Sequence, residues 1–385
     1  MPPYDILVVD DSVFMRKIIT DLISEDPAFR VVGAAKNGRE GVEMVKKLKP
    51  HAVTLDIEMP EMNGLEALKA IMKDHPVPVI MLSSLTQEGA AETIRALEWG
   101  AFDFVGKPSG SISLDLHKVK VLLLEKLHTA VKAKVRPVTG ISWSSRTASA
   151  APAAPPAPRT PAAAAPPAPP MRTETPAAKP PERIRSAAAG VQTFDHLVAI
   201  GTSTGGPRAL HQVLSDMPDH YPAPVLIVQH MPPNFTKSLA QRLDSISKLT
   251  VVEAENGMVL ERGTAYVAPG GYHMTVARNG TQSYKIHLSK DEPRGGHRPS
   301  VDTMFESLLP LKELKRHIVI MTGMGADGAK GMQALKQAGA ITTIAESEET
   351  CVVYGMPRAA VELGCVMHVV PQQQIAGMLI QSVGR

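Results

Sequence analysis

The chain has 385 residues, with 41 Lys and Arg against 38 Asp and Glu and a formal charge of +3. The length predicts two domains, and the near balance of charge argues against a nucleic-acid or membrane-surface partner. Two cysteines, Cys351 and Cys365, cannot build a disulfide framework. The N-terminal stretch reaches two carboxylates before any signal-peptide-like run, and no window supplies the ~20 apolar residues of a membrane span. We therefore expect a cytoplasmic monomer without membrane insertion.

Five apolar runs alternate with helical patterns in the first third of the chain. The runs are YDILVVD, RVVGAA, AVTLDI, VPVIML and FDFVGK. Strands that alternate with helices are typical of βα units in a doubly wound parallel sheet. The pattern therefore predicts one α/β domain.

Three carboxylates lie at the carboxyl ends of two of these predicted strands. Asp10 and Asp11 end the first strand and Asp56 ends the third, where a doubly wound sheet opens onto its ligand crevice. Three converging carboxylates repel one another unless a hard cation such as Mg²⁺ holds them together. Lys107, after the fifth strand, supplies a counter-charge, and Ser83 a hydroxyl from the fourth. Acids at strand ends can also be helix caps, but the full set in this order favours a cation site.

This set resembles the receiver domain of bacterial response regulators over about residues 3–132. By that resemblance, Asp56 accepts a phosphoryl group from a histidine kinase, while Mg²⁺ and Lys107 neutralise the charge of the transferring group. The magnesium ligands that the resemblance implies are Asp10, Asp11, Asp56 and the backbone near Glu58, and the implied switch residues are Ser83, Phe104 and Lys107.

A compositionally biased tract separates the two halves. Residues 135–190 consist mainly of Ala, Pro, Ser, Thr and Arg, and such a segment cannot bury enough apolar surface to offset its ordering entropy. We expect a disordered linker, which at ~3.1 Å per residue could reach on the order of 150 Å if it were largely polyproline-like. A proline-rich docking ligand is the alternative.

Residues 193–385 return to alternating strands and helices. The apolar runs are HLVAIGTS, PVLIVQH, LTVVEAE, HIVIMTG, AITTIAE and CVMHVV, which again predict an α/β sheet. The segment TAYVAPGGYHMTVARNGTQSYKIHLS interrupts that rhythm, and its Asn279-Gly280 lies between alternating runs. Asn-Gly in that position predicts a β-hairpin.

Three strand ends in this half carry a serine, a histidine and an aspartate. Ser203 lies among glycines between a strand and a helix, and His230 and Asp327 each follow another strand. A helix cap would explain Ser203 alone, and a structural histidine would explain His230 alone. Together they supply a nucleophile, a base and an orienting carboxylate at one edge of a parallel sheet. The three positions therefore predict a serine hydrolase.

The stretch Gly323–Gly328 reads G-x-G-x-x-G, and Glu346 follows at the distance of a ribose-binding acid. A dinucleotide loop attracts pyrophosphate with backbone amides, and a carboxylate at Asp327 would repel that anion. The same amides suit a tetrahedral oxyanion, and Asp327 suits an imidazolium. We therefore interpret this loop as part of the hydrolase site.

The motifs IGTSTGGP, QHMP, GGHRPSVD and MTGMGADGA, joined to a receiver, are similar to the chemotaxis protein-glutamate methylesterases, the CheB family. The resemblance implies a flavodoxin-like receiver and a Rossmann-like hydrolase with an added hairpin. It also implies hydrolysis of γ-glutamyl methyl esters on chemoreceptors, deamidation of receptor glutamines, and no cofactor for ester hydrolysis. The residues it implies are Ser203 as nucleophile, His230 as general base and acid, Asp327 as orienter, the Met324 amide as oxyanion donor, and Thr204, Arg294, His297 and Arg298 in the substrate cleft. A solvated basic loop is the alternative for the last three.

In that family, the unphosphorylated receiver covers the catalytic cleft. The tract at residues 135–190 is longer than the short connector expected there, so we expect weaker inhibition. A catalytically inactive binding regulator is a rival reading, although all three triad residue types are present. A DNA-binding output is disfavoured, because no basic recognition-helix pattern occurs.

Overall fold

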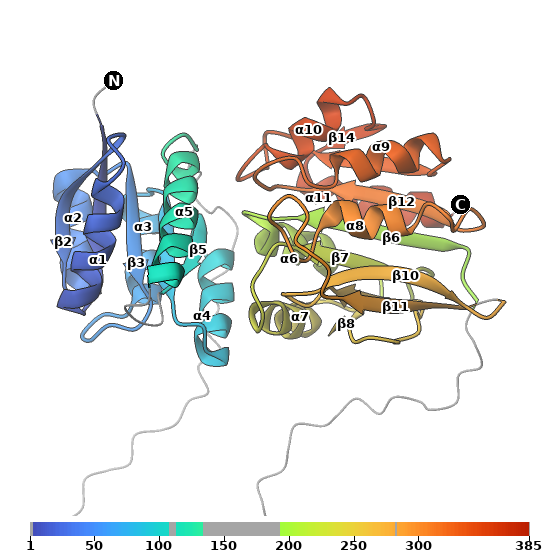
Figure 1. Cartoon of the computed structure of the whole chain (residues 1–385), viewed down its shortest axis with the longest axis horizontal. Helices are drawn as coiled ribbons and strands as arrows, with labels where there is room; N and C mark the ends of the chain where they lie inside the picture. The colour runs from blue at the N-terminus through green and yellow to red at the C-terminus, as the bar shows by residue number, and fades with distance from the viewer. Residues whose placement is uncertain (1–2, 108–112, 134–192, 282, 385) are drawn as a thin grey trace, which may run out of the picture. The chain divides into compact units, whose positions relative to one another are not determined.

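The structure is a computed structural model that describes residues 3–107, 113–133, 193–281 and 283–384. The predicted linker, residues 135–190, lies outside the described residues. The remaining residues form two α/β domains, which we call the N-terminal and the C-terminal domain (Figure 1). No helix in the described ranges is long and apolar enough to cross a bilayer.

The N-terminal domain is a five-stranded parallel sheet with the order β2-β1-β3-β4-β5. Its strands are β1 (Tyr4–Val9), β2 (Phe29–Ala35), β3 (Ala52–Asp56), β4 (Val79–Ser83) and β5 (Asp103–Gly106). Its helices are α1 (Val13–Ser24), α2 (Gly38–Leu48), α3 (Gly64–Asp74), α4 (Gln87–Glu98) and α5 (Ser113–Ala130). The strand order reverses between β1 and β3, which is where a doubly wound sheet opens a ligand crevice.

Helices cover both faces of this sheet, as its continuous apolar strands predict. Every residue of β3 and β4 is buried, as expected for a parallel sheet between two helical layers. Side chains of α1 and α5 pack on one face, and those of α2, α3 and α4 pack on the other. Helix α3 begins at a capping box, in which Asn63 and Glu66 each accept the other's backbone N–H.

The C-terminal domain is a seven-stranded parallel sheet with the order β14-β13-β12-β6-β7-β9-β8. Its strands are β6 (His196–Thr202), β7 (Val225–Gln229), β8 (Thr250–Glu253), β9 (Thr264–Val267), β12 (Lys315–Ile320), β13 (Thr342–Glu346) and β14 (His368–Val370). Its helices are α6 (Gly206–Ser215), α7 (Phe235–Ile246), α8 (Val301–Ser307), α9 (Ala329–Gln337), α10 (Met356–Glu362) and α11 (Gln372–Val383).

This sheet also lies between two helical layers. Side chains of α6, α7 and α11 pack on one face, and those of α8, α9 and α10 pack on the other. The predicted class, two doubly wound parallel sheets, is therefore confirmed.

The central strand β6 has β12 on one side and β7 on the other, so the carboxyl ends of these three strands are neighbours.

The predicted hairpin forms from β10 (His273–Asn279) and β11 (Ser283–Ser289). Gly280 has φ +73° in the connection, a backbone conformation that glycine adopts without steric cost. The segment that interrupts the strand–helix rhythm also contributes β9, which joins the main sheet instead of the hairpin. All four residues of β9 are buried, and four residues are too few for their periodicity to reveal this.

Candidate functional site

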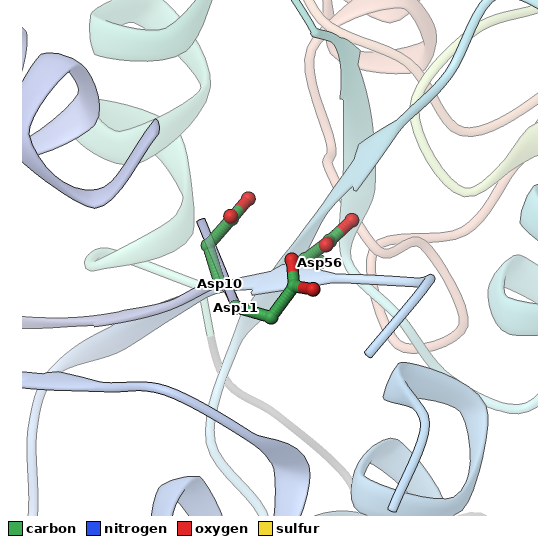
Figure 2. Close-up of side chains that lie close together, drawn as sticks. All are labelled: Asp10, Asp11 and Asp56. Carbon is green, nitrogen blue, oxygen red and sulfur yellow. The ribbon is translucent and has the colours of Figure 1, made fainter. Parts of the chain in front are cut away.

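Three carboxylates gather at the carboxyl ends of β1 and β3 (Figure 2). Asp10, Asp11 and Asp56 each offer a carboxylate oxygen, and these oxygens lie within 4.8 Å of one another. Asp10 and Asp56 are buried. Lys107 Nζ lies 3.0 Å from Asp10 Oδ2 and 2.7 Å from Asp56 Oδ1. The sequence prediction of an acidic cluster with a lysine counter-charge is thus met by the geometry.

The charge of this cluster is not balanced by the protein. Burial is the largest influence on the Asp56 carboxyl and raises its pKa to about 6, although Lys107 opposes that shift. Among the described residues, buried Asp56 Oδ2 has no hydrogen-bond partner. A hard divalent cation prefers carboxylate oxygens as ligands. Asp56 Oδ2 is such an oxygen and has no other partner among the described residues. The residues present therefore fit Mg²⁺.

The other receiver residues lie at different places around this cluster. Glu58 is exposed and its side chain is not part of the cluster; its Oε1 accepts from Ser84 Oγ at 3.3 Å. Ser83 is fully buried, and its hydroxyl lies 2.7 Å from the hydroxyl of Thr93 on α4. Phe104 is buried as well. Ser83 and Phe104 are thus buried and Lys107 is partly exposed, and no hydrogen bond joins the Ser83 hydroxyl to Asp56.

In the C-terminal domain, Ser203 lies on the turn between β6 and α6. Its backbone N–H donates to Thr322 O at 3.0 Å, which ties the turn to the segment after β12. Gly205 is the N-cap of α6 and has φ +81°, a conformation that favours glycine. A Cβ on Gly323 would lie 2.9 Å from Ser203 Cβ. Glycine at position 323 therefore lets the two turns approach each other.

His230 and Asp327 meet across this edge of the sheet. His230 follows β7, and its N–H donates to Thr202 O on β6 at 3.2 Å. His230 Nε2 lies 2.8 Å from Asp327 Oδ2, and the two side chains are 7% and 8% exposed. A carboxylate only accepts, so Nε2 carries the proton of the neutral ring and Nδ1 is the free base nitrogen. Nδ1 is buried and has no partner among the described residues.

The Asp327 carboxylate is held by four donors. Besides His230, it accepts from Ser300 Oγ at 3.0 Å and from the amides of Val301 and Asp302 at 2.7 and 3.0 Å. Burial alone would raise the pKa of Asp327, but His230 and these amides outweigh it and lower the pKa to about 2. Asp327 therefore stays ionised and can stabilise an imidazolium.

Ser203, His230 and Met324 line one hollow, together with part of the segment that follows β11. The amides of Met324 and Gly325 have no acceptor among the residues described. Free amides in a hollow that a serine and an imidazole also line suit the oxyanion of a tetrahedral intermediate. These are the groups that a serine hydrolase would need as nucleophile, base and oxyanion donor.

Three of the four residues proposed for the cleft line this hollow, namely Thr204, His297 and Arg298. Arg294 does not line it, because its guanidinium pairs with Glu306 on α8, with Nη2 2.7 Å from Oε1. The sequence suggested a cleft position for Arg294 because it is close to His297 in the chain. The sequence could not reveal that Glu306, twelve residues further on, binds its guanidinium.

Sequence reasoning missed two further groups. Gln229 donates from Nε2 to Ser203 O at 2.9 Å and to His230 O at 3.2 Å, which links the two catalytic turns. Ser300 is the N-cap of α8, and a serine directly before an apolar run is a sequence pattern that predicts a helix N-cap.

Glu346 is fully buried and accepts from Thr322 N at 2.8 Å. It therefore braces the loop internally, which contradicts a ribose-binding role.

The fold and these two groups of side chains are those of a hydrolase joined to a domain of the response-regulator type. The response regulator receiver domain matches residues 6–117, and the CheB methylesterase domain matches residues 198–379. A protein-glutamate methylesterase/protein-glutamine glutaminase of Geobacillus kaustophilus is 48% identical over 100% of both chains. Its namesake in Bacillus subtilis is 42% identical, over 98% of each chain.

Among solved structures, the catalytic domain of Thermotoga maritima CheB methylesterase is 44% identical, covers 48% of this chain and 97% of its own, and has a TM-score of 0.47. The response regulator domain of Thermotoga maritima CheB is 55% identical, covers 34% of this chain and 98% of its own, and has a TM-score of 0.32. The full-length relatives show that the chain belongs to the CheB methylesterase family.

Proposed function

We propose that Ser203, His230 and Asp327 carry out the methylesterase reaction of this family, with γ-glutamyl methyl esters of chemoreceptor cytoplasmic domains as substrates. The full-length relatives are named for this activity and for glutaminase activity. The observation that carries the assignment is the His230–Asp327 pair, which leaves Nδ1 without a partner among the described residues, while His230 and Ser203 line the same hollow. We place the reaction in the cytoplasm, in a monomer.

The reaction follows from these contacts. Ser203 Oγ attacks the ester carbonyl, and its proton passes to His230 Nδ1. The oxyanion accepts from the Met324 amide, while Asp327 stabilises the imidazolium. His230 then protonates the departing methanol, and an acyl-serine remains. Water attacks this ester by the same steps, which releases the glutamate side chain. With a glutamine side chain, the first leaving group is ammonia instead of methanol.

The ring of His230 has the reverse orientation of the serine-protease triad. In that triad Nε2 serves the serine and Nδ1 bonds the aspartate, whereas here Nε2 bonds Asp327 at 2.8 Å. Either nitrogen of a neutral imidazole can act as base, provided that the other carries the proton. The identity of the base nitrogen is therefore set by the side from which Asp327 approaches.

We propose that Asp56 accepts a phosphoryl group from a histidine kinase and that this modification regulates the esterase. Bound to Asp10, Asp11 and Asp56, Mg²⁺ would supply positive charge to the transferring phosphoryl group. Lys107, already 2.7 Å from Asp56 Oδ1, adds a second positive charge. The raised pKa of Asp56, about 6, fits a carboxyl whose charge needs a cation.

The test is release of methanol from a methylated chemoreceptor cytoplasmic fragment, with and without a small phosphodonor and Mg²⁺. We expect wild-type protein to release methanol and phosphodonor to increase the rate. Ser203→Ala should release none above background, and Asp56→Asn should keep only the basal rate. Turnover by folded Ser203→Ala at near wild-type rate would overturn the serine mechanism. A phosphodonor response in Asp56→Asn would overturn the acceptor assignment.

A further inference from the structure

The imidazole of His230 is stacked on a second imidazole. The rings of His230 and His297 are nearly parallel, with an interplanar angle of 6° and centroids 3.8 Å apart. His297 is partly buried and lies in the hollow that Ser203 also lines. The reaction described above gives His297 no proton to carry. Its contact with the base therefore requires another explanation.

His230 needs help to hold its orientation. Among the described residues its ring makes one hydrogen bond, from Nε2 to Asp327, and buried Nδ1 has none. A single hydrogen bond leaves an imidazole free to swing about the Nε2···Oδ2 axis, which would move Nδ1 relative to Ser203. A flat ring against its face removes that freedom, and misplacement of a reacting atom by 1 Å can cost about 10²-fold in rate.

The chain holds His297 in place by a closed turn. Arg294 and His297 exchange both backbone hydrogen bonds, at 3.1 and 3.0 Å. The two residues between them, Gly295 and Gly296, have φ +58° and +84°, which only glycine adopts without strain at both positions. The Arg294 guanidinium is bound at 2.7 Å to Glu306 of α8. The turn is thus anchored to the helix whose N-terminal amides hold Asp327.

The charge state of His297 suits this position. Burial and the neighbouring His230 lower the pKa of His297 to about 4, although Asp327 opposes the shift. A neutral ring presents its π face to the imidazolium that forms during the reaction, which is favourable. A protonated ring would repel that imidazolium.

We propose that His297 is a positioning residue for the hydrolysis, which holds the imidazole plane of His230 and thereby fixes the position of Nδ1 beside the hollow that Ser203 also lines. This inference rests on the proposed function. His297 acts through its ring face and not through its nitrogens, so an aromatic hydrocarbon ring should replace it. This separates the proposal from its strongest rival, in which a His297 nitrogen binds the substrate.

The experiment compares His297→Ala, His297→Phe and His297→Asn in the full chain, with methylated receptor fragment as substrate. We expect His297→Ala to lower kcat by about 10- to 100-fold with KM changed less than twofold. His297→Phe should recover most of kcat, and His297→Asn should not. The matched control is His287→Ala, because His287 is an exposed histidine on β11 and should leave kcat unchanged.

Two further readouts separate positioning from general damage. The rate at which a fluorophosphonate labels Ser203 should fall in His297→Ala and recover in His297→Phe. The downfield N–H proton resonance of the His230–Asp327 hydrogen bond should broaden in His297→Ala and be sharp in His297→Phe. The proposal is overturned if His297→Asn recovers kcat better than His297→Phe, or if folded His297→Ala keeps wild-type kcat. Failure of the proposed function looks different, since Ser203→Ala would then stay active.

Discussion

The acidic cluster of the N-terminal domain and the triad of the C-terminal domain are built at equivalent places, the carboxyl ends of parallel strands, but their electrostatics differ. Asp327 receives four donors, and its pKa falls to about 2. Asp56 keeps a buried oxygen that has no partner in the described part of the chain, and its pKa rises to about 6. The Asp327 carboxylate is thus satisfied by protein donors, whereas the carboxylates around Asp56 have the charge and the ligand atoms to fit an external cation.

The largest effect is expected when the proposed nucleophile, Ser203, is removed. We expect Ser203→Ala to lower kcat by on the order of 10⁴- to 10⁶-fold, because the triad acts as a unit. For the same reason, Ser203→Ala combined with His230→Ala should be hardly slower than Ser203→Ala alone. Methanol release from methylated receptor measures both. A double variant that is slower by a further factor of 100 would show that the two residues act independently.

If the acidic cluster around Asp56 needs a cation, phosphoryl uptake and basal esterase activity should respond differently to removal of Mg²⁺. Chelation of Mg²⁺, or Asp56→Asn, should abolish incorporation of label from a small phosphodonor, because the carboxylates then lack charge compensation or the acceptor. Basal esterase activity should survive both treatments, since no carboxylate of the cluster serves the triad. Loss of basal turnover on chelation alone would contradict this division.

Ser300 tests how much each donor to Asp327 contributes. Ser300→Ala removes one of four hydrogen bonds to the carboxylate and the side-chain cap of α8, whose Thr303 N–H lies 3.3 Å from Ser300 Oγ. We expect about a tenfold loss in kcat and about 1 kcal/mol of unfolding free energy. Ser245→Ala, on the exposed face of α7, is the control. Wild-type kcat in Ser300→Ala would mean that the two amides suffice.

The connection between the domains predicts a smaller effect. Effective concentration falls roughly as the −3/2 power of tether length, so a threefold longer tether weakens inhibition by about fivefold, or roughly 1 kcal/mol. We expect a fragment from about residue 192 to be more active than the unphosphorylated whole chain, and a shortened Ala/Pro tract to deepen the inhibition. Equal turnover by the fragment and the whole chain would assign the receiver a role in localisation.

The last prediction concerns stability instead of activity, at a buried histidine outside both sites. Burial lowers the pKa of His317 on β12 to about 4, whereas the unfolded chain takes up this proton near pH 6.5. Between these values the unfolded state binds more protons, so the free energy of unfolding decreases as pH falls from about 6.5 to 4, by on the order of 1–3 kcal/mol. Urea unfolding of His317→Asn should show a shallower pH dependence. An unchanged slope would contradict the assignment.

Much of both sites followed from the sequence because strand ends are local features. Apolar runs fix where each strand stops, and the residue after each stop must lie at the edge of a parallel sheet. By that rule Asp10 and Asp56 lie at strand ends of one sheet, and Ser203, His230 and Asp327 follow β6, β7 and β12 of the other. Family motifs then added the roles that chemistry alone left open.

Only the tertiary structure decided how these residues face one another. The order β12-β6-β7 makes three distant turns neighbours, and it depends on packing between segments far apart in the chain. The same long-range packing brings Nε2 instead of Nδ1 of His230 to Asp327, pairs Arg294 with Glu306, and stacks His297 on His230. The sequence by itself determined which chemical groups reach the sheet edge. Ring orientation and side-chain partners were decided in three dimensions, because hydrogen bonds and ring contacts form between neighbours in space whose separation in sequence carries no periodic signal.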